Sequence, residues 1–198
     1  MEILAWNCRG INNDSAVQAL CMVVREKKSS IVFLCETKVH NIDYMGSLQL
    51  ELGMLNCEAV FSEGQSEGLA LFWKDEIQVT FLSKSKHHID VEILENDGSG
   101  VRWRLTSFYG HPSMNERHQT WDLLRDLRDQ SSLPWVVIGD FNQLLYNSEK
   151  EGGETCCESQ MQLFRDALSY CELADLGFFG PMFTWKGPGM RSWVKKLE

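Results

Sequence analysis

Residues 69–109 read LALFWKDEIQVTFLSKSKHHIDVEILENDGSGVRWRLTSFY, and this stretch decides the fold class. Four strand-like segments follow one another here with only polar turns between them, and a fifth precedes them. The tripeptide Asn96-Asp97-Gly98 is a strong signal for a β-hairpin between the last two. The five predicted strands are Glu58–Phe61, Leu69–Trp73, Gln78–Leu82, Ile89–Leu94 and Val101–Tyr109.

The sequence before this block alternates between strand and helix. Glu2–Asn7 has the character of a buried strand, and Ile31–Cys35 is a second apolar run of strand length. Between them, apolar residues at positions i, i+3, i+4 and i+7 predict a helix with Asp14 or Ser15 as its N-cap. The four apolar positions are Val17, Leu20, Cys21 and Val24, and a weaker helix is predicted over about Tyr44–Leu52, ending at Gly53.

The sequence after the block returns to the same alternation. A helix is predicted over Glu116–Asp129, a buried strand over Trp135–Gly139, a helix marked by Met161, Phe164, Leu168 and Cys171, and a short strand over Phe183–Trp185. Because helices flank a central run of antiparallel strands, we expect a layered α/β sandwich, with two packed sheets and helices outside. The chain shows no repeat or linker, so we expect a single domain over residues 1–198.

Composition limits the class of protein. The net charge of −9 and the pI near 5.1 argue against a passive nucleic-acid binder but permit a metal enzyme that acts on a phosphodiester. We expect no membrane contact, since no apolar run approaches about 18 residues. The absence of a signal-peptide pattern and the odd number of cysteines, seven, predict an intracellular protein with reduced thiols. Nothing in the sequence implies a stable protein partner.

Polar residues stand where several predicted strands finish: Asn7, Glu36, Tyr109, Asp140 and Asn142. Each alone has an ordinary explanation, such as a turn hydrogen bond, a solvated strand end or a core aromatic. Together they supply a carboxylate and an amide for a hard cation, a second carboxylate for proton transfer and neutral donors for phosphate oxygens. This combination is typical of phosphodiester cleavage with magnesium.

At these positions the sequence resembles the endonuclease/exonuclease/phosphatase superfamily, which has the DNase I-like fold. Further motifs, in the same order along the whole chain, are similar to the endonuclease domain of plant non-LTR retrotransposons. The superfamily motifs are Trp6-Asn7-Cys8-Arg9-Gly10, Phe33-Leu34-Cys35-Glu36-Thr37-Lys38, Phe108-Tyr109-Gly110 and Ile138-Gly139-Asp140-Phe141-Asn142; the further ones are Gly68-Leu69-Ala70-Leu71-Phe72-Trp73, Pro134-Trp135, Glu149-Lys150-Glu151-Gly152-Gly153 and Asp175-Leu176-Gly177 leading to Phe183-Thr184-Trp185.

The resemblance implies a four-layer α/β sandwich and a hydrolase that cleaves DNA with Mg²⁺ or Mn²⁺. It makes Glu36 the main metal ligand, with Asn7 supporting the metal and the hydrogen bonds of the active site. Tyr109 and Asn142 would contact the phosphate, and Asp140 would align or deprotonate the attacking water. Gln143 stands where the retrotransposon branch generally has Glu, and we expect little effect from this difference. Nuclear localisation is consistent with the resemblance.

The resemblance also implies further C-terminal strands that carry a second Asp and a Ser-Asp-His segment with the catalytic histidine. The sequence given ends at Val194-Lys195-Lys196-Leu197-Glu198, and none of its five histidines stands in that context. We therefore expect the 198-residue chain to nick DNA slowly or not at all. Three hypotheses remain open: a retrotransposon-type DNA endonuclease, a catalytically impaired remnant of one, and a phosphatase acting on a small phosphate ester.

Overall fold

The computed structural model describes residues 1–62, 68–96, 98–152, 155–177, 185–186 and 194–195, and the chain forms two compact units. The first comprises Met1–Tyr109 and Leu133–Asp140, and the second comprises Gly110–Ser132 and Phe141–Glu198. The single domain predicted over residues 1–198 stays a prediction, because the compactness of each unit does not reveal whether either one folds alone.

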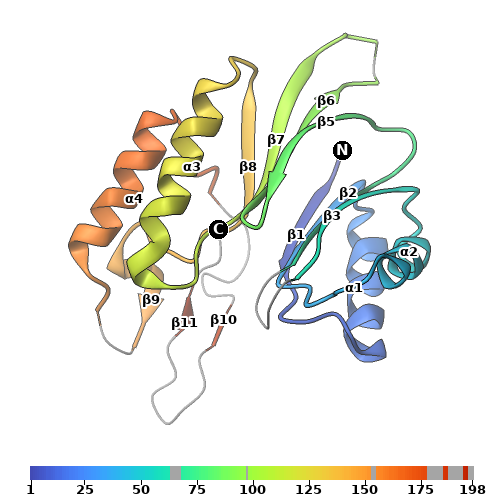
Figure 1. Cartoon of the computed structure of the whole chain (residues 1–198), viewed down its shortest axis with the longest axis horizontal. Coiled ribbons are helices and arrows are strands. Elements are labelled where there is room, and N and C mark those ends of the chain that lie inside the picture. The colour runs from blue at the N-terminus through green and yellow to red at the C-terminus, as the bar shows by residue number, and fades with distance from the viewer. Residues whose placement is uncertain (63–67, 97, 153–154, 178–184, 187–193, 196–198) are drawn as a thin grey trace. The chain divides into compact units, whose positions relative to one another are not determined.

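Two four-stranded sheets form the framework of the first unit (Figure 1). One has the strand order β1-β2-β4-β3 and the other has the order β5-β6-β7-β8. Both are mixed, because β1 with β2 and β7 with β8 are parallel while the other neighbours are antiparallel. The strands are β1 Ile3–Asn7, β2 Ile31–Cys35, β3 Asn56–Val60, β4 Leu69–Trp73, β5 Gln78–Ser85, β6 His88–Leu94, β7 Arg102–Tyr109 and β8 Trp135–Asp140.

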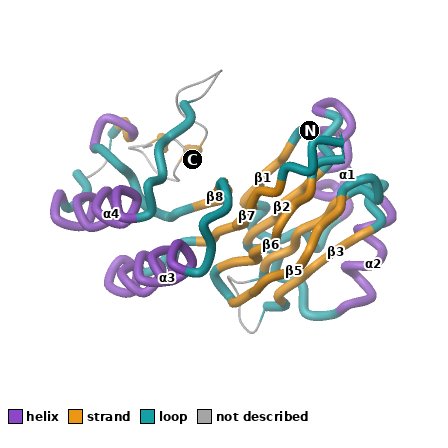
Figure 2. Tube along the Cα trace, turned by 90° about the horizontal axis from the view of Figure 1, so that it is seen from above, coloured by secondary structure: helices purple, strands orange, loops and turns teal. Residues whose placement is uncertain are grey.

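The two sheets pack face to face through an apolar core. Phe33 and Leu71 of the first sheet meet Val91 and Leu105 of the second in this core, and all four are buried. The opposite face of the first sheet packs against helices α1 (Asp14–Lys27) and α2 (Ile42–Glu51), as Figure 2 shows. Strand β2 therefore faces apolar neighbours on both sides, which explains why its sequence is uniformly apolar instead of alternating.

The second unit is built on a pair of helices, α3 (Arg117–Asp129) and α4 (Glu158–Tyr170). The ring of Phe164 stacks on Trp121 with centroids 4.5 Å apart and contacts Phe141 at 5.4 Å. This unit also contains two 3₁₀ turns and a small sheet of order β10-β11-β9. These elements are η1 Met114–Glu116, η2 Asn147–Glu149, β9 Lys150–Glu151, β10 Trp185–Lys186 and β11 Val194–Lys195.

The predicted fold class, an α/β fold with two packed sheets and accompanying helices, is confirmed, and β2 and β4 begin and end at the predicted residues. The burial predicted for Glu2–Asn7 and Trp135–Gly139 is wrong. Strands β1 and β8 are half-buried, because each lies at an edge of its sheet. The α1 cap is Asn13, whose side chain accepts a hydrogen bond from the Ala16 N–H at 2.9 Å, and not Asp14 or Ser15. Of the predicted strand Phe183–Trp185, Phe183 and Thr184 lie outside the described residues.

All seven cysteines lie in the described part of the chain, and each is a free thiol. Among the helices described, none combines the length and the apolar character that crossing a bilayer requires.

A buried polar cluster lies on β5, β6 and β7. Arg104 and Asp90 are both about 1% exposed or less, and they form an ion pair with Nη2 and Oδ2 2.7 Å apart. His88 is on the same face of β6 as Asp90, and hydroxyl groups lie against both of its ring nitrogens. Ser83 Oγ is 2.9 Å from Nε2 and Ser85 Oγ is 2.8 Å from Nδ1. Burial, together with the positive charge of Arg104, lowers the pKa of His88 to about 4, against the opposing effect of Asp90.

This pKa predicts a loss of stability in mild acid. The unfolded chain takes up a proton at His88 as the pH falls through about 6.5, whereas the folded chain does so only near 4. The contribution of His88 to the free energy of unfolding should therefore be fully present above pH 6.5. It should fall by about 3 kcal/mol between pH 6.5 and pH 4 and change no further below that. Urea unfolding over this pH range measures the slope. His88→Gln should make the slope shallower, and the exposed control His118→Gln should not; equal slopes in all three proteins would contradict the account.

Candidate active site

Four of the five predicted site residues lie where parallel strands of the first unit end. Asn7 is the last residue of β1, and Glu36 directly follows Cys35, its partner in β2. Tyr109 and Asp140 are the last residues of β7 and β8, and they are partners in the register of those strands. Because β1 and β2 both contact β8, the two pairs of strand ends come together across the sheets.

The amide of Asn7 joins the two carboxylates. Its Nδ2 donates to Glu36 Oε1 at 2.7 Å and to Asp140 Oδ2 at 2.9 Å. The Tyr109 hydroxyl donates to the same Glu36 oxygen at 3.0 Å. A carboxylate only accepts hydrogen bonds, so the nitrogen of the amide and not its oxygen has to face the pair. The amide oxygen of Asn7 instead accepts the backbone N–H of Arg9 at 3.2 Å.

Glu36 has an unusual backbone conformation, with φ of +55°. For a residue with a Cβ, the left-handed region costs roughly 1–2 kcal/mol, so the surrounding structure must hold it there. The loop after β1 does this, since the Cys8 N–H donates to Cys35 O at 3.1 Å and the Gly10 N–H donates to Glu36 O at 2.7 Å. Backbone strain of this kind is concentrated at functional sites, and here it turns the Glu36 side chain toward Asn7 and Tyr109.

The position of Asp140 depends on the glycine before it. Gly139 has φ of +136°, and a Cβ at this position would lie 1.9 Å from the carbonyl oxygen of Phe108, its partner in β7. Only glycine therefore allows β8 to approach β7 this closely. The close approach places Asp140, which is 7% exposed, opposite Tyr109.

The thiols beside the site are not reactive groups. Burial raises the pKa of Cys8 to about 11 and raises the pKa of Cys35 well above its usual range. Both thiols stay protonated at neutral pH and provide neither a nucleophile nor a thiolate ligand. The anionic groups of the site are carboxylates, which suit hard cations and not soft ones.

The donor set fits a magnesium-type ion. Glu36 Oε1 is engaged by Asn7 and Tyr109, whereas no described residue donates a hydrogen bond to Oε2. The described residues contain no group of three or more His, Cys, Asp or Glu side chains suited to a metal, so the protein would contribute few ligands. Mg²⁺ keeps several waters and needs only one or two carboxylates. Glu36 and Asp140 would supply the oxygens; a ligand role for Asn7, whose oxygen faces Arg9, stays a prediction.

Asn142, the fifth predicted residue, belongs to the second unit. Its backbone is left-handed, with φ of +53°, which asparagine tolerates better than most residues, and its Nδ2 donates to Gly110 O at 2.7 Å. That Asn142 and Tyr109 contact a phosphate stays a prediction. In this structure the Tyr109 side chain is 2% exposed and its hydroxyl is directed at Glu36.

Gln143 has structural contacts that sequence reasoning missed. It is 8% exposed, and its Oε1 accepts from the Leu144 N–H at 3.1 Å and from Arg117 Nη1 at 3.4 Å. Its buried Nε2 has no hydrogen-bond partner among the described residues. A glutamate here would offer Arg117 a charged acceptor and leave no buried donor without a partner, so the difference from glutamate affects local hydrogen bonding.

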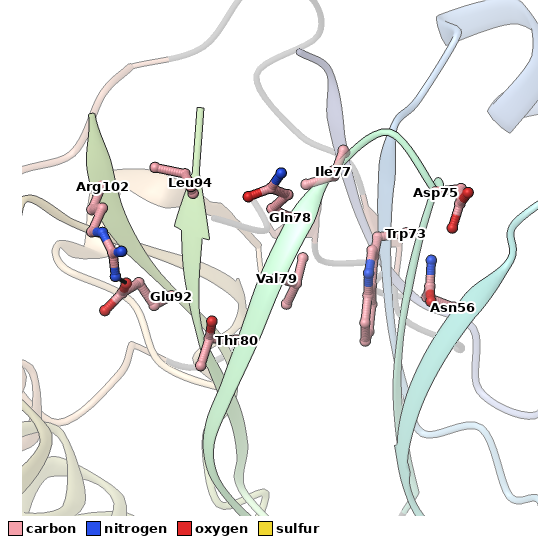
Figure 3. Close-up of a pocket in the computed structure, with 10 residues that line it drawn as sticks. All are labelled: Asn56, Trp73, Asp75, Ile77, Gln78, Val79, Thr80, Glu92, Leu94 and Arg102. Carbon is pink, nitrogen blue, oxygen red and sulfur yellow. Dashed lines mark hydrogen bonds and ion pairs between the residues drawn. The ribbon is translucent and has the colours of Figure 1, made fainter. Parts of the chain in front are cut away.

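A cavity of about 410 Å³ in the first unit is a poorer candidate for the site (Figure 3). It lies at the other end of the strands, since its residue Trp73 is the partner of Ile31 at the start of β2. Gln78, Val79 and Thr80 all line it, although successive residues of a strand point to opposite faces. In Figure 3, Val79 points toward Trp73 while Thr80 points toward Glu92, so the hollow curves around the edge of β5 and brings no two carboxylates together.

Comparison with known proteins identifies a matching family and solved structures with a similar fold. Residues 4–193 match the sequence model of the Endonuclease/Exonuclease/phosphatase family. The endonuclease domain of TRAS1, a telomere-specific non-LTR retrotransposon, superimposes with a TM-score of 0.67 at 13% identity, covering 98% of this chain and 81% of that one. An AP endonuclease from Archaeoglobus fulgidus superimposes with a TM-score of 0.61 at 18% identity, covering 84% of this chain and 68% of that one. The catalytic domain of Xenopus laevis APE2 superimposes with a TM-score of 0.59 at 16% identity, covering 85% of this chain and 67% of that one. A sequence comparison with curated proteins gives no match.

The bridging role of Asn7 is tested by Asn7→Asp, which keeps the shape of the side chain but replaces the donor with a third carboxylate. At pH 7 without divalent cations, the free energy of unfolding should fall by about 2–3 kcal/mol, through lost hydrogen bonds and charge repulsion. Millimolar Mg²⁺ or acid should restore part of the loss, since each reduces the repulsion. Urea unfolding in EDTA and in Mg²⁺ measures both effects.

Asn41→Asp is the matched control. Asn41 caps α2 by accepting the Tyr44 N–H at 2.8 Å, and an aspartate accepts the same bond equally well. We expect little change in this variant. If Asn7→Asp were as stable as the parent protein in EDTA, the two carboxylates would not depend on an amide donor.

Proposed function

Because this chain belongs to the Endonuclease/Exonuclease/phosphatase family, we propose that it hydrolyses phosphodiester bonds at the cluster of Asn7, Glu36, Tyr109 and Asp140. The observation that carries the proposal is the single amide nitrogen, Asn7 Nδ2, that donates to carboxylates from two different sheets at 2.7 and 2.9 Å. Two carboxylates held side by side can divide the work, one binding a cation and the other handling a proton.

We propose Glu36 as the principal ligand of Mg²⁺ or Mn²⁺, through its Oε2, with Asp140 close enough to share the ion or its water shell. When bound, such an ion polarises the phosphoryl group and offsets the charge that develops there. The chain itself orients the ligand. Hydrogen bonds from Asn7 and Tyr109 hold Glu36 Oε1, so the carboxylate cannot rotate freely about its last bond.

Asp140 is the proposed group that aligns the attacking water or takes its proton. It is 7% exposed, and Asn7 holds its Oδ2. The Asn142 amide, two residues further along the chain, is the proposed donor to a phosphate oxygen. A carboxylate is a weaker base than imidazole at neutral pH, so we expect this chain to cleave slowly.

The proposed substrate is DNA, and the proposed type is a retrotransposon endonuclease. The fold likeness to the TRAS1 endonuclease domain extends over 98% of this chain and supports this choice. The net charge of −9 means that the protein as a whole repels DNA, and we propose that a cation at the carboxylates supplies part of the local attraction. Binding to DNA should therefore depend on the divalent ion as well as on salt.

The test is nicking of supercoiled plasmid in Mg²⁺ at high protein concentration and long incubation. The unmodified chain should nick slowly, and EDTA should stop it. Asp140→Ala should slow nicking by about 10²–10⁴-fold through loss of proton transfer, and Glu36→Gln should weaken the dependence on Mg²⁺.

Glu92→Gln is the matched control, because Glu92 is paired with Arg102 away from the site, and it should leave the rate unchanged. Nicking that survives both Glu36→Gln and Asp140→Ala would assign the activity to a contaminating nuclease. No nicking under any condition would contradict the proposed activity.

A further inference from the structure

The backbone of Tyr109 is held on both sides by one residue, His87. The Tyr109 N–H donates to the carbonyl oxygen of His87 at 2.8 Å. The carbonyl oxygen of Tyr109 is 3.0 Å from Nδ1 of the His87 ring. A carbonyl can only accept, so this contact requires a hydrogen on Nδ1 of the His87 ring.

This side-chain bond lies just beyond the end of the β6–β7 register. The register of β6 with β7 ends at His88 and Phe108, and the chain passes into the second unit at Gly110. His87 itself lies in the tight turn between β5 and β6. Ser85 Oγ fixes this turn by accepting the His87 N–H at 3.1 Å. The imidazole extends the β6–β7 pairing by one more hydrogen bond.

The Tyr109 side chain cannot easily compensate for a shift of its backbone. It is 2% exposed, and its ring packs in the core between the two sheets with Phe33 and Leu105. Its hydroxyl meets Glu36 Oε1 at 3.0 Å, so a displacement of the Tyr109 backbone would be transmitted to the carboxylate. His87 is also buried, at 9% exposed, so its ring has little room to move relative to Tyr109.

We propose that His87 is a positioning residue, which sets the Tyr109 hydroxyl against Glu36 by holding the end of β7. The structural part of this inference is independent of any activity, and only its kinetic part rests on the proposed function. The imidazole acts through its Nδ1–H and needs no change of charge to do so. Its effect on the site passes entirely through Tyr109.

Two substitutions of His87, to Asn and to Gln, test whether the position of the donor nitrogen matters apart from the size of the side chain. Asn carries its amide nitrogen at the same bond distance from Cβ as His Nδ1, whereas Gln carries it one bond further out. His87→Asn should therefore keep the hydrogen bond to the Tyr109 carbonyl, and His87→Gln should lose it. The two variants differ by one methylene group, so a difference between them reports the position of the donor.

The structural readout is NMR. In the unmodified chain, ¹⁵N shifts of the His87 ring should show the proton on Nδ1; a proton on Nε2 alone would overturn the proposal without any variant. In protein with ¹³C-labelled tyrosine rings, the Tyr109 signal is assigned by its absence in Tyr109→Phe. This signal should move in His87→Gln and stay near its native position in His87→Asn. An unmoved signal in His87→Gln would contradict the proposal.

The kinetic readout is plasmid nicking. His87→Gln should nick about tenfold more slowly, and His87→Asn should stay within about twofold of the parent, because a misplaced group loses part of its effect on the transition state. Adding His87→Gln to Tyr109→Phe should cause no further loss, since both act on the same hydroxyl. Additive losses would overturn the proposal. If no form of the chain nicks DNA, the proposed function fails while the NMR result still decides the role of His87.

Discussion

The site depends on one amide nitrogen, Asn7 Nδ2, held between the carboxylates of Glu36 and Asp140. Two carboxylates that share one donor lie close enough to repel each other, and the hydrogen bonds from the Asn7 amide offset part of this repulsion. The arrangement requires β1 and β8, the edge strands of two different sheets, to end at the same place. The sandwich of sheets is thus the means by which two carboxylates distant in sequence come to share one donor.

Several local features serve this arrangement at a cost in stability. Glu36 is held in a left-handed conformation, Gly139 is required for close approach, and the buried Cys35 and Tyr109 lie beside the carboxylates. The conformation of Glu36 costs on the order of 1 kcal/mol, which the apolar core between the sheets offsets. A rigid surrounding of this kind fixes the carboxylates before any ligand arrives, so little reorganisation is needed on binding.

The sequence predicted those parts of the molecule that local patterns determine. Strands β2 and β4 were predicted at the observed residues, because an apolar run between polar turns specifies a buried strand. The burial of β1 and β8 was mispredicted, because the sequence of a strand does not reveal whether the strand lies at the centre or at the edge of its sheet. Their positions at strand ends pointed to Glu36 and Asp140, and the resemblance assigned their roles. No local signal gives the backbone conformation of Glu36 or the direction of the Asn7 amide. The contacts of His87 and Gln143 were missed because their partners, the Tyr109 carbonyl and Arg117, are distant in sequence.

The most direct test of the account is paramagnetic resonance of Mn²⁺ titrated into the protein, comparing the parent chain with Glu36→Gln, Asp140→Asn and Glu92→Gln. One weak site is expected in the parent chain and in Glu92→Gln. Binding at this site should weaken by about tenfold or more in Glu36→Gln, and by a smaller factor in Asp140→Asn. Equal Mn²⁺ binding by the parent and Glu36→Gln would contradict the assignment of the carboxylate pair as a cation site.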